Sequence, residues 1–513
     1  MATEGLVRTS IHVDPRVFPI DNLPQEVIDQ IGYHLSSSDL LTLLQWSSTC
    51  RFYRALFAPL VFNSVTIGIH INSSPCVQTL RSNRHVKSLT LSCATGRSVL
   101  RRSRMCRDLS AHRYMYKRHF TWINCSFIET ILRQLPPSLE SLTLYFPDEW
   151  LTLNQVYWPC FSFEPEQSPL TDYERVHLHR RLLWTIFDSV AKNHDMAEKP
   201  NGFALTIHNV APHPSGVYHQ PCLGEFLRKI TSFTMSLCKF QSIAGDRVRL
   251  PKTGWFRYMI TGWFYDSLHS ITEFKLVANA AWQVALKFND VPSYSTLCPL
   301  PSHFPQLRHL SLENMFIDSR LVDYLTYPFH ATILESVTLH NCFCHTTTND
   351  NVESSDAAAE TLDFPDAPTW SDFFGMLVNA ATCKLTSVSV TYDISLVSER
   401  MPCYFDKRHR HSPELCAFRK DSLNMSWVCD SLIEAAALDN LCDEYTRFST
   451  TACRKHLHRS RVFLYSSIDP VKRAFTPGVW DTTLRYADGS DLESWKRLVD
   501  KMTRNGGRNL PRC

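Results

Sequence analysis

The chain has little glycine: only 15 of its 513 residues, against 28 prolines. Loops that cradle phosphate groups need glycine, because its missing side chain lets backbone amides approach the anion. The sequence also contains no GxGxxG, GxxxxGKS/T, GxSxG or HExxH pattern, and these patterns are typical of nucleotide-binding proteins, serine hydrolases and zinc proteases. We therefore expect a protein that has no catalytic residues and no cofactor.

Long apolar runs and a strong excess of one charge are missing as well. No stretch of 18 apolar residues occurs, and the first residues, MATEGLVRTSIHVDPRVF, lack the apolar core of a signal peptide. The formal net charge is only +3, whereas nucleic-acid-binding domains usually carry a concentrated basic face. We expect no membrane and no nucleic-acid partner, and a cytoplasmic or nuclear protein whose 18 cysteines are reduced and mostly buried.

The usual cysteine spacing of zinc sites, CxxC, does not occur. The nearest group of potential ligands consists of Cys403, His409, His411 and Cys416. Its spacing matches no standard zinc site, and 22 histidines with 18 cysteines produce such groups by chance. Cys342 and Cys344, next to His345, end an expected strand, and we interpret them as packing residues. No metal site is predicted, and a metal-dependent or thiol enzyme is only the third hypothesis on function.

Residues 23–62, LPQEVIDQIGYHLSSSDLLTLLQWSSTCRFYRALFAPLVF, predict three short helices. Pro24 suits the first helical turn, the serines at 36–38 end the first helix and cap the second beside Asp39, and Pro59 marks the end of the third. Each helix carries an apolar stripe at helical spacing. The three stripes are Val27, Ile28, Ile31 and Leu35; Leu40, Leu41, Leu44 and Ser47; and Cys50, Tyr53, Leu56, Phe57 and Leu60.

Three helices of this length are too small to enclose all of these side chains. Some of the apolar side chains therefore remain available to a partner, as in recognition of a helix by a groove. Periodicity alone fits an ordinary helical cap on a larger core equally well.

The order of residues in this segment resembles the F-box. The resemblance rests on Leu-Pro-x-Glu-Val-Ile-x-x-Ile, then Asp-Leu-Leu-x-Leu-Leu, then Cys-Arg-x-Tyr-Arg-x-Leu and Pro-Leu-Val-Phe. The chain departs from many F-boxes at Ser47 and Thr49, which are often more apolar, and at Tyr53, where tryptophan is common. The resemblance implies a three-helix unit over 20–62 that docks on a Skp-type adaptor and, through it, on the cullin of an SCF (Skp–cullin–F-box) ubiquitin ligase. The adaptor-binding residues that it implies are Leu23, Pro24, Val27, Ile28, Ile31, Leu40, Leu41, Leu44, Cys50, Tyr53 and Leu56.

After the helices, one pattern returns seven times: apolar-x-x-apolar-x-apolar. The copies are Val86/Leu89/Leu91, Leu139/Leu142/Leu144, Ile230/Phe233/Met235, Ile271/Phe274/Leu276, Leu307/Leu310/Leu312, Leu334/Val337/Leu339 and Leu385/Val388/Val390. The fragment FALTIHN at 203–209 is an eighth copy without its first position. The pattern resembles the leucine-rich repeat, although its separations of 27 to 91 residues are long and irregular.

We expect a mixed α/β fold: the three-helix unit, then an irregular leucine-rich-repeat-like solenoid with long insertions over 63–485. The segment 370–383 supplies one of the helices on the convex side. An unrelated α/β domain whose strands happen to alternate is the other interpretation. Residues 490–503 predict a helix, with a capping box at Ser490 and Glu493, that seals the solenoid, and 504–513 a mobile tail.

Two insertions differ in charge. The segment 97–119 carries eight lysines and arginines against one acid, and 346–369 is acidic with the composition of a flexible loop. A basic run could target the nucleus or bind nucleic acid, but we interpret both insertions as solvated segments.

Residues between the spaced apolar positions should line one face of the solenoid. The side chains on it that we expect to contact a target protein are Tyr145, Glu273, Lys275, His309, Glu313 and His340. The predicted function is the substrate-recognition subunit of an SCF-type ubiquitin ligase, which holds an unknown target near a ubiquitin-conjugating enzyme. The alternative is a scaffold that binds the adaptor or another protein without a role in ubiquitination.

Overall fold

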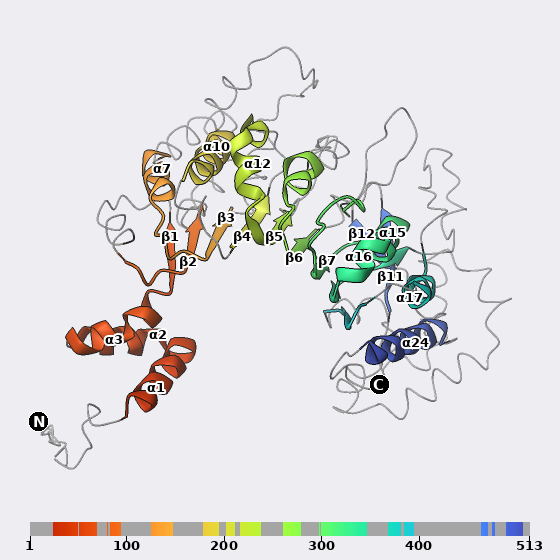
Figure 1. Ribbon diagram of the computed structural model, residues 1–513, viewed down its shortest axis with the longest axis horizontal. Coiled ribbons are helices and arrows are strands. Elements are labelled where there is room, and N and C mark those ends of the chain that lie inside the picture. The colour runs from red at the N-terminus through yellow and green to blue at the C-terminus, as the bar shows by residue number, and fades with distance from the viewer. Residues whose placement is uncertain are drawn as a thin grey trace, which may run out of the picture.

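The chain folds as a curved parallel sheet with helices along its outer side and at both ends (Figure 1). The computed structural model describes residues 24–49, 51–68, 80, 83–93, 125–146, 178–193, 202–210, 216–237, 260–278, 297, 299–345, 368–380, 384–393, 463–469, 474–477 and 489–505. Within these ranges, no helix is both long enough and apolar enough to cross a membrane.

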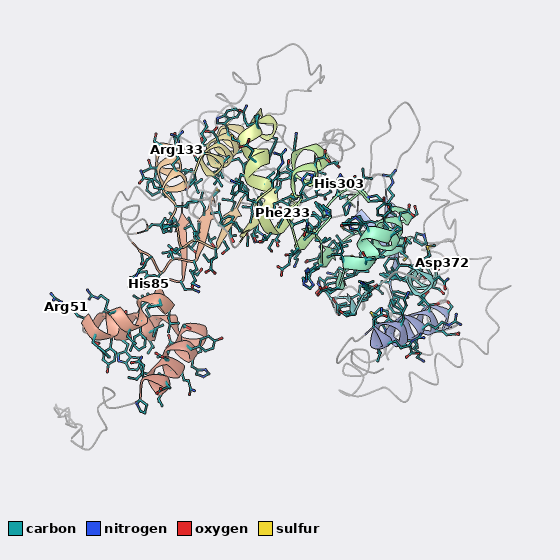
Figure 2. The ribbon with its side chains drawn as sticks, in the orientation of Figure 1. Arg51, His85, Arg133, Phe233, His303 and Asp372 are labelled. Carbon is teal, nitrogen blue, oxygen red and sulfur yellow. The ribbon has the colours of Figure 1, made fainter. Side chains whose placement is uncertain are left out.

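The first three helices are α1 (Gln25–Ser38), α2 (Leu40–Thr49) and α3 (Arg51–Val61). They pack around a small core of their own, which consists of Ile28, Leu43, Tyr53, Phe57 and Val61. The half-buried Trp46 lies against two rings of this core, with centroids 5.3 Å from Tyr53 and 5.0 Å from Phe57. Figure 2 shows Arg51 at the outer end of α3, so this helix runs from solvent toward the sheet.

Three details of these helices correct the expectations from sequence. The serines at 36–38 continue α1, because Ser36 and Ser38 donate their hydroxyls to carbonyls of the preceding turn. Asp39 caps α2 instead, and accepts hydrogen bonds from the backbone amide and the hydroxyl of Thr42. Pro59 lies inside α3, where it removes one hydrogen bond while the amide of Phe62 still donates to Ala58.

The sheet has nine parallel strands, and they follow one another in chain order. They are β1 (Ser64–Gly68), β2 (Ser88–Ser92), β3 (Ser141–Tyr145), β4 (Phe203–Val210), β5 (Ile230–Leu237), β6 (Glu273–Val277), β7 (His309–Glu313), β8 (Ser336–His340) and β10 (Ser387–Thr391). All seven predicted copies occur as strands in one register, so that Leu89, Leu142 and Leu205 lie side by side and are buried. This arrangement is consistent with a repeat solenoid.

The strand β4 shows why the eighth copy has no apolar residue at its first position. Gly202 stands there with a φ of 76°, a conformation that favours glycine. A Cβ at this point would lie 2.3 Å from a side-chain atom of Thr231. The close approach of two neighbouring repeats therefore excludes any larger residue.

Helices cover the outer side of the sheet (Figure 1). They are α7 (Cys125–Arg133), α10 (Leu178–Ala191), α12 (Pro221–Leu227), α15 (Ser319–Thr326), α16 (Pro328–Ile333) and α17 (Trp370–Asn379), with short 3-10 turns η3 (Gly216–His219) and η4 (Tyr265–Ser267). Their apolar faces and the inward side chains of the strands form one continuous core from Ile67 to Met502. The partly buried Phe62 packs against both this core and the core of α1–α3.

The far end of the sheet carries β9 (Cys344–His345), β11 (Tyr465–Asp469), β12 (Ala474–Pro477) and the last helix, α24 (Ser490–Arg504). The expected capping box at Ser490 is wrong, because α24 is preceded by Gly489, which has no side chain to cap it. A capping box occurs on α17 instead, between Thr369 and Asp372. Figure 2 shows Asp372 on this helix, near α24.

Several predictions fall outside the described residues. These are the basic insertion 97–119, most of the acidic loop (346–367), the end of the tail (506–513), the cluster from Cys403 to Cys416, and the two predicted adaptor-binding residues Leu23 and Cys50.

Candidate interaction surfaces

The three N-terminal helices expose large apolar side chains. Among the described residues, ten large apolar side chains are exposed, and half of them lie in α1–α3. Their exposed fractions are 37% for Val27, 70% for Tyr33, 65% for Leu41, 40% for Leu44 and 55% for Phe52. Such a concentration on a small unit is typical of a surface that another molecule covers.

The helices expose these residues because their own core is already filled. On α2 the buried position is Leu43, so that Leu41 and Leu44 on either side remain outside. Helices α1 and α3 approach closely at Gly32, where an added Cβ would lie 2.9 Å from the ring of Phe57. The core has therefore no room for the remaining apolar side chains.

Eight of the eleven predicted adaptor-binding residues have side chains that the structure describes, and these eight fall into three groups. Pro24, Val27, Leu41 and Leu44 are exposed, whereas Ile31 and Leu56 are half-buried. Ile28 and Tyr53 are buried in the core of the three helices, so they support the surface and do not form it. Leu40 begins α2.

The sequence reasoning missed Tyr33 and Phe52. Both are exposed aromatic residues that stand outside the predicted apolar stripes. An aromatic residue off the stripe of an amphipathic helix is a signal that could have pointed to them, since such a residue is costly on a surface that stays in water.

A second surface is the face of the sheet that points away from the outer helices. All six predicted target-binding residues lie on it, because they alternate with the buried positions of their strands. The register places Glu273 beside His309 and Glu313 beside His340 on adjacent strands. The sheet therefore pairs residues that are 36 positions apart, Glu273 and His309, and 27 positions apart, Glu313 and His340.

These side chains also contact one another and their neighbours. The Lys275 ammonium lies 3.3 Å from the Glu313 carboxylate. The Ser232 hydroxyl donates to Glu273 at 3.1 Å. Nδ1 of His309 lies 2.8 Å from the Ser336 hydroxyl.

Tyr145 lies apart from this group, on β3. Its ring is 40% exposed and lies 5.6 Å from the ring of His208 on the neighbouring strand. Burial, and secondarily the charge of Lys275, lower the pKa of His208. The imidazole of His208 is therefore held neutral, and this part of the face has no formal charge.

The face is thus divided into two halves. Over β1–β5 the outward residues of the paired strands are serine, threonine, alanine and glycine with only Tyr145 and His208 added, and among them Thr66, Thr90 and Thr143 are paired in register. Over β6, β7, β8 and β10 the outward positions are serine, threonine and one valine, to which β6, β7 and β8 add two carboxylates, one lysine and two imidazoles. We call these the hydroxyl half and the charged half.

The cysteines at the end of β8 have the character of packing residues. Cys342 and Cys344 are buried, and burial raises the pKa of Cys342 to about 12 and that of Cys344 well above its ordinary value. The Cys342 thiol donates to the backbone carbonyl of Leu312 at 3.4 Å. A thiol that stays protonated is a poor nucleophile. In the described part of the chain, no three histidine, cysteine or acidic side chains are grouped so as to hold a metal ion.

Comparison with known proteins adds little to this geometry. No protein-family model matches the sequence, and no curated protein matches it. Among solved structures, the leucine-rich repeat-containing protein LegL7 from Legionella pneumophila is similar over 64% of this chain and 91% of its own, with 12% sequence identity and a TM-score of 0.22. A TM-score of 0.22 is too low to establish a shared overall fold.

Proposed function

We propose that this chain is the substrate-recognition subunit of an SCF-type ubiquitin ligase. In this proposal α1–α3 are an F-box that docks on a Skp-type adaptor, and the sheet binds a target protein. The observation that supports it most is the exposure of Leu41 and Leu44 on a helix whose inward position is occupied by Leu43. Both exposed leucines belong to the segment that resembles the F-box.

The energetics favour a partner for this surface. Burying a fully exposed leucine is worth about 1.5–3 kcal/mol, and Leu41 and Leu44, which are 65% and 40% exposed, would each contribute a part of that. A surface with several such side chains can therefore supply the anchors of a stable interface.

The arrangement also suits delivery of a target. The bundle stands at one end of the curved sheet, and Phe62 packs against the cores of both (Figure 1). A target bound on the sheet would be held at a fixed place relative to the adaptor. Proximity of this kind raises the effective concentration of the target at the ubiquitin-conjugating enzyme, and it needs no catalytic group on this chain.

Charged substitutions on α2 test the adaptor-binding step. The double variant Leu41→Asp/Leu44→Asp should bind a Skp-type adaptor at least about 100-fold more weakly, because two apolar anchors are lost and two charges would be buried. The matched control is Gln45→Asp/Ser48→Asp, which adds the same charge to exposed polar positions of the same helix. Affinity is measured with the full chain and purified adaptor by calorimetry.

Equal binding of the wild type and the leucine variant would contradict the adaptor-binding step. Circular dichroism of both double variants checks that the helices are intact. Recovery of cullin and ubiquitin conjugates with the wild-type complex supports the ligase role, whereas a complex with adaptor alone would favour the scaffold.

A further inference from the structure

Among the described residues, the charged half of the sheet face has an excess of negative charge. Three carboxylates lie on or beside it, those of Glu273, Glu313 and Asp393, against the ammonium of Lys275, while Arg308 and Glu335 beside β7 and β8 form an ion pair with each other. The described outward positions of the hydroxyl half carry no formal charge that could balance the three carboxylates. We infer that the charged half binds a positively charged, extended segment of a target protein, an inference that rests on the proposed function because it names the class of target.

We call these three carboxylates the acidic strip. They differ in how many contacts they already make with other groups of the chain. Glu273 is exposed and accepts a hydrogen bond from the Ser232 hydroxyl, which carries no charge. Asp393 has a side chain that is 59% exposed, accepts from the amide of Asn341 at 2.9 Å, and lies 3.6 Å from Nε2 of His340. Both carboxylates can therefore accept a further hydrogen bond from a cation.

Glu313 is different, because a cation of the chain itself already occupies it. Its carboxylate lies 3.3 Å from the ammonium of Lys275, and only 23% of its side chain is exposed. Lys275 thus stands where a basic side chain of the target would bind. Removing this lysine should make the acidic strip a better partner for a basic segment.

The spacing of the strip fits an extended chain that crosses the strands. Glu313 lies one strand interval from Glu273 and four residues further along the strands, and Asp393 lies two intervals from Glu313 and about two residues further along. Neighbouring carboxylates of the strip are therefore separated by roughly 12–14 Å. About four residues of an extended chain cover that distance. The segment that fits best therefore has basic residues about four positions apart.

Neutral substitutions of acidic and of basic residues should have opposite effects, and this difference tests the inference. The probes are three fluorescein-labelled peptides of glycine and serine, which carry arginine, glutamine or glutamate at every fourth position, and binding to the full chain is measured by fluorescence anisotropy. The arginine peptide should bind the wild type most tightly. Glu273→Gln or Asp393→Asn should weaken it about threefold to fivefold, and Lys275→Gln should tighten it by a similar factor.

Matched substitutions on the helices control for a general effect of charge. Glu225→Gln on α12 and Lys496→Gln on α24 change the net charge equally at exposed positions away from the face. They should leave the affinity unchanged within about twofold. A mere disturbance of folding would weaken binding in every variant, so only electrostatic recognition predicts tighter binding for Lys275→Gln.

Three outcomes overturn the inference. The first is that the arginine peptide binds no more tightly than the glutamine peptide. The second is that Lys275→Gln weakens binding, and the third is that the helix controls act as strongly as Glu273→Gln. Adaptor binding is measured on the same preparations. Loss of the peptide preference with intact adaptor binding would overturn this inference alone, whereas a peptide preference without adaptor binding would overturn the proposed function.

Discussion

Helices stand at both ends of the curved sheet, and the two ends differ in how far their apolar side chains are covered. At the N-terminal end, α1–α3 leave Leu41 and Phe52 more than half exposed. At the other end, α24 buries Trp495, Leu498 and Met502 completely against the main core. The chain itself therefore covers the apolar face of the helix at one end, whereas at the other end apolar side chains stay exposed, as the proposed adaptor surface requires.

The closed end is held by charges as well as by apolar contacts. Asp491, at the start of α24, accepts hydrogen bonds from the amide of Ser371 at the start of α17 and from the buried hydroxyl of Tyr465. Lys501, near the end of α24, donates to three carbonyls at the end of α17. The two helices therefore run parallel, and Asp491 and Lys501 place opposite charges at the two ends of the α17 dipole.

The largest expected effect contrasts the apolar residues of the two ends. Trp495→Ala should lower the free energy of unfolding of the C-terminal end by about 3–5 kcal/mol, because its ring packs 5.1 Å from Phe374 and 5.9 Å from Phe463. Leu41→Ala should change stability by less than about 0.5 kcal/mol, since its side chain already lies in water. Hydrogen exchange of peptides from α17, α24 and α2 measures both effects.

Comparable losses of protection from hydrogen exchange in Trp495→Ala and Leu41→Ala would contradict the difference between the two ends. They would mean that Leu41 is covered within the chain, and that α2 is not an open surface.

A smaller effect concerns the charge that joins α24 to α17. Asp491→Ala should destabilise this end by about 2–3 kcal/mol, because it leaves the Tyr465 hydroxyl and the Ser371 amide without their carboxylate acceptor in a buried place. Asp500→Ala, at an exposed position of the same helix, is the matched control and should have little effect. Urea unfolding of the full chain and hydrogen exchange at α17 distinguish the two variants. Equal midpoints of the two urea transitions would show that the Asp491 carboxylate contributes little to stability.

The sheet could be predicted from the sequence because its inward positions repeat. Each strand needs a spaced pair of buried apolar residues, and the parallel register aligns these pairs from β2 to β10. The strand β1 was missed although Phe62, Val65 and Ile67 show the same spacing, because Phe62 had been assigned to the last helix of the bundle.

The ends of the molecule were harder to predict, because they depend on contacts between distant segments. The strand β11 pairs with β9 about 120 residues earlier, and Tyr465 binds Asp491 on a helix that was expected to carry only a local capping box. The exposure of Leu41 and Leu44 on α2 agrees with the resemblance to the F-box, but periodicity could not predict it. Periodicity cannot tell which of the leucines at 41, 43 and 44 faces inward until α1 and α3 are placed against it.

The smallest expected effect compares two glycines in helix interiors at opposite ends. A Cβ added at Gly375 in α17 meets nothing within 4 Å, so Gly375→Ala should stabilise α17 by about 0.5–1 kcal/mol through its higher helix propensity. At Gly32 in α1, an added Cβ would lie 2.9 Å and 3.0 Å from Phe57 and Leu60. Gly32→Ala should therefore lose that gain and destabilise the bundle by about 1 kcal/mol, since the packed Phe57 ring must move.

Hydrogen exchange at α3 and α17 measures the difference between the two substitutions. Stabilisation by both substitutions would show that α1 and α3 are loosely packed. Opposite signs would show that the open end is tightly built inside, so that its exposed leucines mark a rigid binding surface and not an incompletely folded one.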